Sequence, residues 1–324
     1  MDMAKYIFKR LGLMLITFLI ILTVCFFLVR CLPVSSVGAP GSDAENIFQA
    51  QREALGYNKP LLEQYWLFWV RLFTGDAQGS HFGYSFHIEY MKSPWDLMIQ
   101  RFPPTILINI YTMLIGVPLG ILIGIFMALK KNKWQDHVLS IVIMLVISVP
   151  SFIYAFFLQY LFGTVWGVLD INFAPGTDWF SPAIMKSMIL PVMAMCFGTV
   201  AGFGRYVRAE LTEVLTSDFM LLARTKGLTR FQATVRHAFR NSLVPIFPMI
   251  LGEFIGILSG SLIIEQIFDI PGVGKLFIQS INQKDYDVFL FVAMFYVIIG
   301  LVGGLIVDLS YGLVDPRIRM GGKK

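Results

Sequence analysis

Apolar runs long enough to cross a lipid bilayer recur along this chain. A bilayer core of about 30 Å needs roughly 20 consecutive apolar residues in a helix. Six runs approach or exceed this length, at about residues 11–32, 105–129, 138–163, 184–204, 244–266 and 289–313. Only 15% of the 324 residues are charged, which is too few for the surface of a soluble protein. The sequence therefore predicts an all-α membrane protein with six transmembrane helices.

The first run follows three basic residues and so has the outline of a signal peptide. It is about twenty residues long, however, and it lacks an A-x-A-like cleavage site. We therefore expect residues 1–32 to form an N-terminal tail and an uncleaved first span.

Basic residues set the orientation of the predicted spans, because lysine and arginine are retained on the cytoplasmic side. If the N-terminus is inside, most of the 26 lysine and arginine residues fall in cytoplasmic segments. The sequence thus predicts an N-in/C-in protein. It also predicts an external subdomain at 33–104, which is too long for a simple connection, and a core of five helices at 105–324.

Glycine recurs at every fourth position in three of the predicted spans. The positions are Gly116, Gly120 and Gly124, then Gly252, Gly256 and Gly260, and finally Gly300 and Gly304. This spacing gives a helix one smooth face, along which another backbone can approach closely. We expect packing between helices of one chain, with a seam between two chains as the alternative.

The basic segment at 205–243 is patterned as two short helices around a turn. Asp218 is suited to the first turn of the first helix, and Gly227 can adopt the left-handed conformation that follows a helix end. Thr229 and Gln232 have the spacing of a capping box for a second helix that runs toward the fifth span.

The second helix of this hairpin has an apolar face, because Phe231, Val235 and Phe239 recur at helical spacing. A helical hairpin of this kind is suited to docking in a groove on a cytoplasmic partner. Contact with anionic lipid headgroups is the alternative. DNA binding is disfavoured because predicted spans flank the hairpin on both sides, so no nucleic-acid partner is expected.

The hairpin resembles the coupling loop of ABC importer permeases, and within them the oligopeptide/dipeptide branch. Two stretches carry the resemblance, ARTKGL at 223–228 and RHAFRNSLVP at 236–245. Leu221 and Leu222 replace the Glu and first Ala of the broader superfamily pattern, which is usual for the peptide branch. The resemblance assigns ATPase coupling to Ala223, Arg224, Thr225, Lys226, Gly227, Leu228, Arg236 and His237.

Other stretches resemble the same family over nearly the whole chain. They include FGYS at 82–85, SVPSF at 148–152 and the closing DPRIR at 315–319. The motif residues to which the resemblance gives a structural role are Pro150, Glu265, Pro271, Gly272, Gly274, Asp308, Asp315, Pro316 and Arg317.

The resemblance implies an ABC importer type I permease-like core in the bacterial cytoplasmic (inner) membrane. It implies a multi-pass transport subunit without catalytic residues, metal or cofactor, and it places ATP and Mg²⁺ in partner subunits. The implied partners are a second homologous permease, two cytoplasmic ABC ATPases, an extracytoplasmic peptide-binding protein and membrane lipid. The implied substrate is a peptide, with a nickel chelate or glutathione as the alternative.

Glu253 lies within the fifth predicted span and matches no family motif. Ionisable residues inside a membrane usually serve function. Glu253 would either line the translocation pathway and meet a peptide amine, or pair with a polar group on another helix. An ion-coupled secondary transporter is the rival function, but few charges fall within the spans and no inverted repeat is visible.

Overall fold

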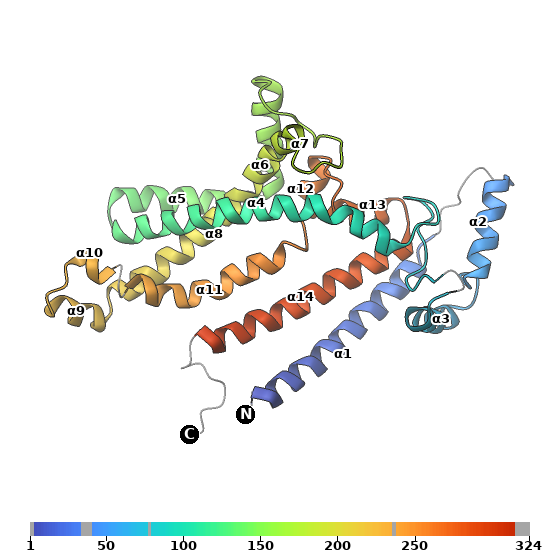
Figure 1. The fold of residues 1–324 in the computed structure, drawn as a ribbon, viewed down its shortest axis with the longest axis horizontal. Coiled ribbons are helices and arrows are strands. Elements are labelled where there is room, and N and C mark those ends of the chain that lie inside the picture. Colours follow the sequence, from blue (N-terminus) through green and yellow to red (C-terminus); the bar gives the residue numbers. More distant parts are fainter. Residues whose placement is uncertain (1–2, 34–40, 77–78, 235–237, 315–324) are drawn as a thin grey trace. The chain divides into compact units, whose positions relative to one another are not determined.

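The computed structural model is almost entirely helical, and Figure 1 shows its helices in chain order. The described residues are 3–33, 41–76, 79–234 and 238–314. Among these residues, β-structure is limited to one isolated bridge between Ser85 and Lys92. The predicted all-α class is confirmed.

The chain divides into two compact units, each with its own apolar clusters. The N-terminal unit comprises Met3–Thr105 and Pro271–Val302, and the core unit comprises Ile106–Ile270 with Gly303–Lys324. Residues 271–302 thus belong with the N-terminal unit, although most of the core unit intervenes in the sequence. The predicted boundaries at 32 and 104 stay predictions.

Among the described residues, the N-terminal unit contains four complete helices and parts of two longer ones. Its complete helices are α1 (Met3–Arg30), α2 (Asp43–Ala54), α3 (Leu61–Thr74) and α13 (Val273–Asn282). The longer helices α4 (Pro94–Leu129) and α14 (Tyr286–Val314) contribute residues to both units. Because α4 begins at Pro94, it extends well into the stretch predicted as the external subdomain.

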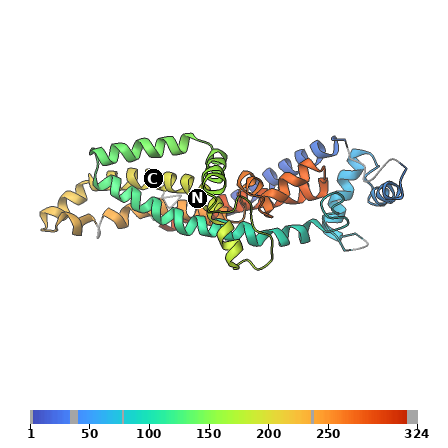
Figure 2. The same ribbon diagram turned by 90° about the horizontal axis from the view of Figure 1, so that it is seen from above.

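The core unit holds the remaining helices, most of them apolar. They are α5 (Trp134–Ser148), α6 (Ser151–Leu158), the π-helix η1 (Gln159–Val165), α7 (Pro182–Ser187), α8 (Ile189–Leu215), α9 (Asp218–Thr225), α10 (Arg230–Ala233), α11 (Phe239–Gly256) and α12 (Leu262–Ile267). Within this unit α8 packs against α5, α6 and α11 (Figure 1 and Figure 2).

Four helical segments in the described residues are long and apolar enough to cross a membrane. They are Lys5–Arg30, Pro94–Leu129, Pro182–Leu215 and Tyr286–Gly312. The number rises to five if the bent pair Trp134–Ser148 and Ser151–Val165 is counted as one span. The predicted membrane-spanning character is confirmed, whereas the count of six spans and the N-in/C-in orientation stay predictions.

The third predicted span, 138–163, is wrong as a continuous helix, because the chain bends by 96° between Ser148 and Ser151. Val149 is extended, with φ −93° and ψ 126°, and Pro150 is the N-cap residue of the next helix. A proline disfavours the helical conformation of the residue before it and has no N–H to donate. These local restrictions separate α5 from α6.

The fifth predicted span, 244–266, is also interrupted in the structure. Helix α11 ends at Gly256, and the chain restarts as α12 at Leu262, where the Ser261 hydroxyl accepts a hydrogen bond from the Ile264 N–H at 3.4 Å. Gly260 between them has φ +64°, a conformation that glycine adopts without steric cost.

The glycine stripe of α4 allows close packing against α8. A Cβ atom on Gly120 would lie 2.7 Å from the Phe203 Cβ, and one on Gly124 would lie 2.6 Å from the Val207 Cβ. Packing within the chain is therefore confirmed for this stripe. In contrast, a Cβ on Gly256, Gly300 or Gly304 would meet no atom within 4 Å.

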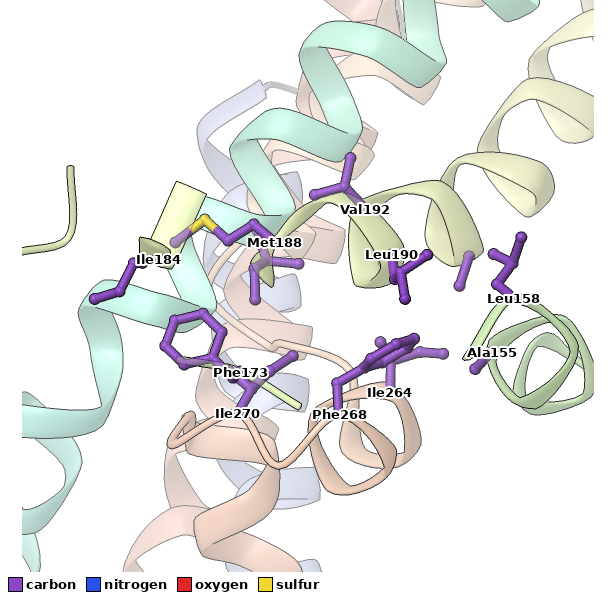
Figure 3. Packing of buried hydrophobic residues seen from close by; sticks show 12 residues of the cluster. Ala155, Leu158, Phe173, Ile184, Met188, Leu190, Val192, Ile264, Phe268 and Ile270 are labelled. Carbon is purple, nitrogen blue, oxygen red and sulfur yellow. The ribbon is translucent and has the colours of Figure 1, made fainter. Parts of the chain in front are cut away.

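An apolar cluster joins α6, α8 and α12 in the core unit. Figure 3 shows Leu190, Ile264 and Phe268 pointing toward one another, with Leu158 of α6 beside them. The Phe173 N–H donates a hydrogen bond to the Phe268 carbonyl at 2.8 Å. This cluster fixes the short helix α12 against the start of α8.

Candidate functional site

Helix α9 ends in a turn that depends on glycine. The Leu228 N–H donates to the Ala223 carbonyl at 3.3 Å, and Gly227 between them has φ +89°. This bond and the left-handed glycine form a Schellman motif, in which the helix stops and the chain reverses. The predicted helix end at Gly227 is confirmed.

The predicted capping box is present at the start of α10. The Gln232 N–H donates to the Thr229 hydroxyl at 3.3 Å, and the Thr229 N–H donates to the Gln232 side-chain oxygen at 3.1 Å. Two N–H groups that a helix start leaves unpaired are thereby satisfied. The turn between α9 and α10 is thus fixed on both sides by local hydrogen bonds.

The hairpin formed by α9 and α10 packs on the ends of two membrane helices. Ala223 of α9 and Ala233 of α10, together with Ala238 just before α11, share an apolar cluster with Ala128 of α4 and Leu211 of α8. Alanine brings helices close because its side chain is short. The hairpin is therefore attached directly to α4 and α8 by close packing.

The opposite side of the hairpin presents apolar side chains to the outside. Leu221 and Leu222 are 57% and 56% exposed, and Thr225, Lys226 and Gly227 beside them are also exposed. The two adjacent exposed leucines form a small apolar surface beside the fixed turn. The family resemblance assigns coupling to the turn and does not include these two leucines.

Three of the predicted coupling residues lie partly or wholly outside the described residues. The backbone of Arg224 belongs to α9, but its side chain is outside the described part, as are Arg236 and His237 entirely. For the same reason, a continuous second helix from Thr229 into the fifth span stays a prediction. The cytoplasmic loop predicted from residue 205 starts later, because α8 continues to Leu215.

An ion pair with a buried carboxylate joins α5 to α8 in the core unit. Arg208 donates from Nε and Nη2 to the two carboxylate oxygens of Asp136, at 2.5 and 2.7 Å. The Asp136 side chain is fully buried, and the Asn132 N–H adds a third bond at 3.1 Å. Such a two-pronged arginine–carboxylate contact fixes both position and orientation.

We expect the substitution Asp136→Asn to destabilise the core unit by about 2 kcal/mol, because it removes charge-assisted hydrogen bonds from a buried group. Thermal unfolding of the purified protein in detergent would measure the change. The matched control is Asp170→Asn. In the native chain the Asp170 Oδ2 lies 3.9 Å from the Lys186 Nζ, and both side chains are half-exposed. This pair should contribute less than about 1 kcal/mol to stability. Equal losses for the two variants would contradict a structural role for the Asp136 pair.

Glu253 of α11 has a polar partner on another helix. The Thr199 hydroxyl of α8 donates a hydrogen bond to the Glu253 carboxylate at 3.0 Å. Glu253 itself is partly exposed, so this bond leaves part of the carboxylate free to meet another group. Its part in the translocation pathway stays a prediction.

A second set of charged residues is buried in the N-terminal unit around Asp287, at the start of α14. Arg30 of α1 donates to its Oδ1 at 2.8 Å, and the Tyr57 hydroxyl donates to Oδ2. Arg71 of α3 donates to the Tyr57 hydroxyl at 2.9 Å. Burial and the nearby Asp287 raise the pKa of Tyr57 to about 12, so the phenol remains a donor.

The FGYS stretch folds against the same end of α14. The Oδ2 atom of Asp285 accepts bonds from the Ser85 hydroxyl at 2.6 Å and from the N–H groups of residues 86–88 at 3.0–3.2 Å. The Tyr84 N–H donates to Asp287 at 3.3 Å. Gly83 has φ +78°, and a Cβ there would overlap the Asp287 carboxylate. The motif therefore serves to pack this loop around two acidic side chains.

Comparison with known proteins assigns the chain to a family. Residues 120–320 match the family described as binding-protein-dependent transport system inner membrane component, and residues 3–109 match its N-terminal region. The chain belongs to this family of permeases. The permease is accordingly a multi-pass transport component of the bacterial cytoplasmic membrane and not a catalytic subunit.

The permease has relatives of similar length. It is 36% identical to the dipeptide transport system permease protein DppB of Lactococcus lactis subsp. cremoris, over 98% of this chain and 100% of the relative. It is 33% identical to the oligopeptide transport system permease protein OppB of Haemophilus influenzae, over 98% of this chain and 100% of that relative.

Solved structures share the permease fold. An amino acid ABC transporter chain matches with a TM-score of 0.53 and 20% identity, over 67% of this chain and 94% of that one. A chain of the MetNI methionine ABC transporter in an inward-facing conformation matches with a TM-score of 0.51 and 14% identity, over 68% of this chain and 99% of that one. At these identities the likeness concerns the fold alone.

The family-motif residues occupy different places in the permease. In the core unit Pro150 is the N-cap residue of α6, Glu265 is buried in α12, and Asp308 lies in α14. In the N-terminal unit, Pro271 and Gly272 precede α13, and Gly274 is buried within it. Asp315, Pro316 and Arg317 lie outside the described residues.

A threonine completes the start of α13 in the permease. Gly272, at the N-cap position, has no side chain to accept a hydrogen bond, and the Val273 N–H instead donates to the Thr105 hydroxyl of α4 at 2.9 Å. The PGVG stretch thus joins α13 to α4. Its predicted structural role stays a prediction, supported by this contact.

Proposed function

We propose that this permease forms half of the membrane pathway of an ATP-driven peptide importer. The curated relatives quoted above are dipeptide and oligopeptide permeases that align over nearly the whole chain. The two family matches likewise cover most of its length. A nickel chelate or glutathione is the alternative substrate, and the external binding protein would make most of that selection.

The observation that carries the coupling role is the exposed tip of the hairpin. Leu221 and Leu222 face outward beside the Gly227 turn, while the alanines on the other side are packed on α4 and α8. In our proposal the exposed side of this hairpin docks into a groove of a cytoplasmic ATPase through the turn at Arg224 to Leu228, with Arg236 and His237. Ala223 contributes to coupling from the packed side. Displacement of the hairpin would then move α4 and α8 directly, because close-packed contacts transmit movement rather than absorb it.

The remaining parts of the importer would be separate proteins. The proposal includes a second homologous permease, two ATPases that bind ATP and Mg²⁺, and an extracytoplasmic peptide-binding protein. Both termini of the permease would be cytoplasmic, since the basic hairpin and the basic C-terminal segment then lie on the same side. Six spans, an external subdomain at 33–104 and a core at 105–324 complete this arrangement.

The substitution Leu222→Asp tests the docking surface. We expect it to weaken the permease–ATPase complex at least about tenfold, because a central apolar contact is worth on the order of 1–2 kcal/mol. Binding of the purified ATPase to the permease in nanodiscs would measure the affinity. Leu222→Met keeps an apolar side chain, and Thr216→Asp adds the charge at an exposed position outside α9. Both controls should bind as the native permease does.

Uptake by the reconstituted importer tests the transport role. We expect accumulation of a labelled tripeptide in liposomes to require ATP and to persist when an ionophore removes all ion gradients. An ion-coupled transporter would give the opposite result. Nickel chelate or glutathione uptake in place of peptide uptake would assign the alternative substrate.

A further inference from the structure

A cavity of about 560 Å³ lies in the core unit where α5 bends into α6. The residues lining it come from the bend (Val146, Ile147, Val149, Pro150, Ser151, Tyr154), from α8 (Ala194, Met195, Gly198, Gly202, Arg205, Tyr206) and from α11 (Met249). This volume is in the range of cavities that bind small ligands. The cavity exists because the bend at Pro150 and two glycines of α8 leave the space unfilled.

Two glycines keep the α8 wall of this cavity open. A Cβ on Gly198 would meet no atom within 4 Å, and a Cβ on Gly202 would approach only the Met249 methyl, at 3.8 Å. At the glycines of α4, in contrast, atoms of α8 occupy the space next to the glycine backbone. Gly198 and Gly202 therefore serve no tight helix contact within the described part of the chain.

Arg205 is the cation of this cavity. No acidic side chain in the described residues forms an ion pair with Arg205, whereas Arg208, one turn along α8, is paired with Asp136. Arg205 is the first charged residue after the uncharged stretch 187–204 of the helical segment Pro182–Leu215, and it is exposed. An arginine without an acidic partner in such a segment is suited to bind an anionic ligand group, and the guanidinium matches a carboxylate in geometry.

Glu253 supplies an anion one helical turn from the cavity lining. It follows Met249 by four residues on α11, and its partner Thr199 shares a face of α8 with Gly202 and Tyr206. Six residues separate Thr199 from Arg205 on α8, which corresponds to roughly 9 Å along the helix axis. An extended tripeptide spans at most about 10 Å. The axial rise from Thr199, the partner of Glu253, to Arg205 is thus comparable to the length of a short peptide.

We propose that this cavity is a binding subsite for short peptides within the permease, with Arg205 binding the terminal carboxylate and Glu253 binding the terminal amine. The proposal rests on the peptide importer function above and assigns its pathway to named residues. Ser151 also lines the cavity and can offer its hydroxyl to the peptide backbone. A site with Arg205 at one end and Glu253 at the other selects peptides whose two termini are both charged. The limited volume of the cavity selects short peptides.

The test compares peptides with free and blocked ends in the complete importer, reconstituted in liposomes with its ATPases and saturating binding protein. The probes are trialanine and trialanine amide. We expect Arg205→Gln to reduce ATP-driven uptake of trialanine at least about tenfold, because a charge-assisted contact is lost, and uptake of the amide by less than about twofold. Arg205→Lys should restore most trialanine uptake, since it keeps the positive charge. Lys133→Gln, which removes an exposed charge elsewhere, should affect neither peptide.

Equal losses for trialanine and its amide in Arg205→Gln would overturn the subsite. That result would also be given by an arginine that binds a lipid phosphate or only maintains the helix. An unchanged rate for both peptides would overturn it as well. Failure of the peptide importer function is distinguishable, because the unmodified complex would then take up neither peptide.

Discussion

Replacing Gly227 by valine is expected to reduce ATP-driven uptake at least about tenfold while the membrane helices remain folded. Gly227 has φ +89°, and a β-branched residue in this region is strained by about 1–3 kcal/mol. The end of α9 would relax to another conformation, and the exposed leucines would no longer be presented in one arrangement. Uptake by the reconstituted importer and binding of the ATPase would measure the effect.

The matched control for this prediction is Gly227→Asn, because asparagine accepts the left-handed conformation better than any β-branched residue. No atom lies within 4 Å of a Cβ at this position, so neither side chain is excluded by space in the permease itself. We expect Gly227→Asn to retain ATPase binding better than the valine variant does. Full uptake by Gly227→Val at normal expression would contradict the coupling role of the turn.

Substituting Asp287 by alanine is expected to destabilise the N-terminal unit by about 3–5 kcal/mol. The change removes the acceptor of a buried pair, with Arg30 and Asp287 side chains only 6% and 7% exposed, and leaves the Arg30 charge uncompensated. The hydrogen bonds from Tyr57 and from the Tyr84 N–H are lost with it. Thermal unfolding in detergent should show a melting temperature lower by on the order of 10 °C.

The control for Asp287 is an ion pair of the same unit that lies at the surface. The Lys59 Nζ, just before α3, lies 2.6 Å from the Glu63 Oε1 in its first turn, and both side chains are 47% exposed. We expect Glu63→Gln to cost less than about 0.5 kcal/mol, because water screens the pair and solvates each charge alone. A loss in Asp287→Ala no larger than that in Glu63→Gln would show that the buried network is not needed for stability.

Local signals in the sequence predict the hairpin well. The reciprocal bonds of Thr229 and Gln232 and the left-handed Gly227 involve residues a few positions apart, so their pattern is readable without the fold. The bend at Pro150 follows from an equally local rule, but hydropathy averaged across the proline hides it. The family resemblance includes the same stretch as a motif without indicating a break.

Contacts between residues far apart in the sequence are not predictable from hydropathy or from the distribution of charge. Hydropathy places Arg30 at the edge of a span, yet the residue binds Asp287, which lies 257 positions later. Arg208 contributes to the charge bias that sets orientation, yet it pairs with Asp136, 72 positions earlier. A charge in the sequence shows that a partner is needed when the residue is buried, but it does not show which partner the fold supplies.

The apolar runs by themselves determined that this chain is a helical membrane protein, because in a bilayer every backbone N–H and C=O needs an internal partner. The capped, glycine-ended turn likewise followed from neighbouring residues. The tertiary structure alone decided that Ala223 faces α4 and α8 while Leu221 and Leu222 face outward. It alone placed Arg205 and Met249 beside one cavity, because side chains on separate helices meet only when those helices pack.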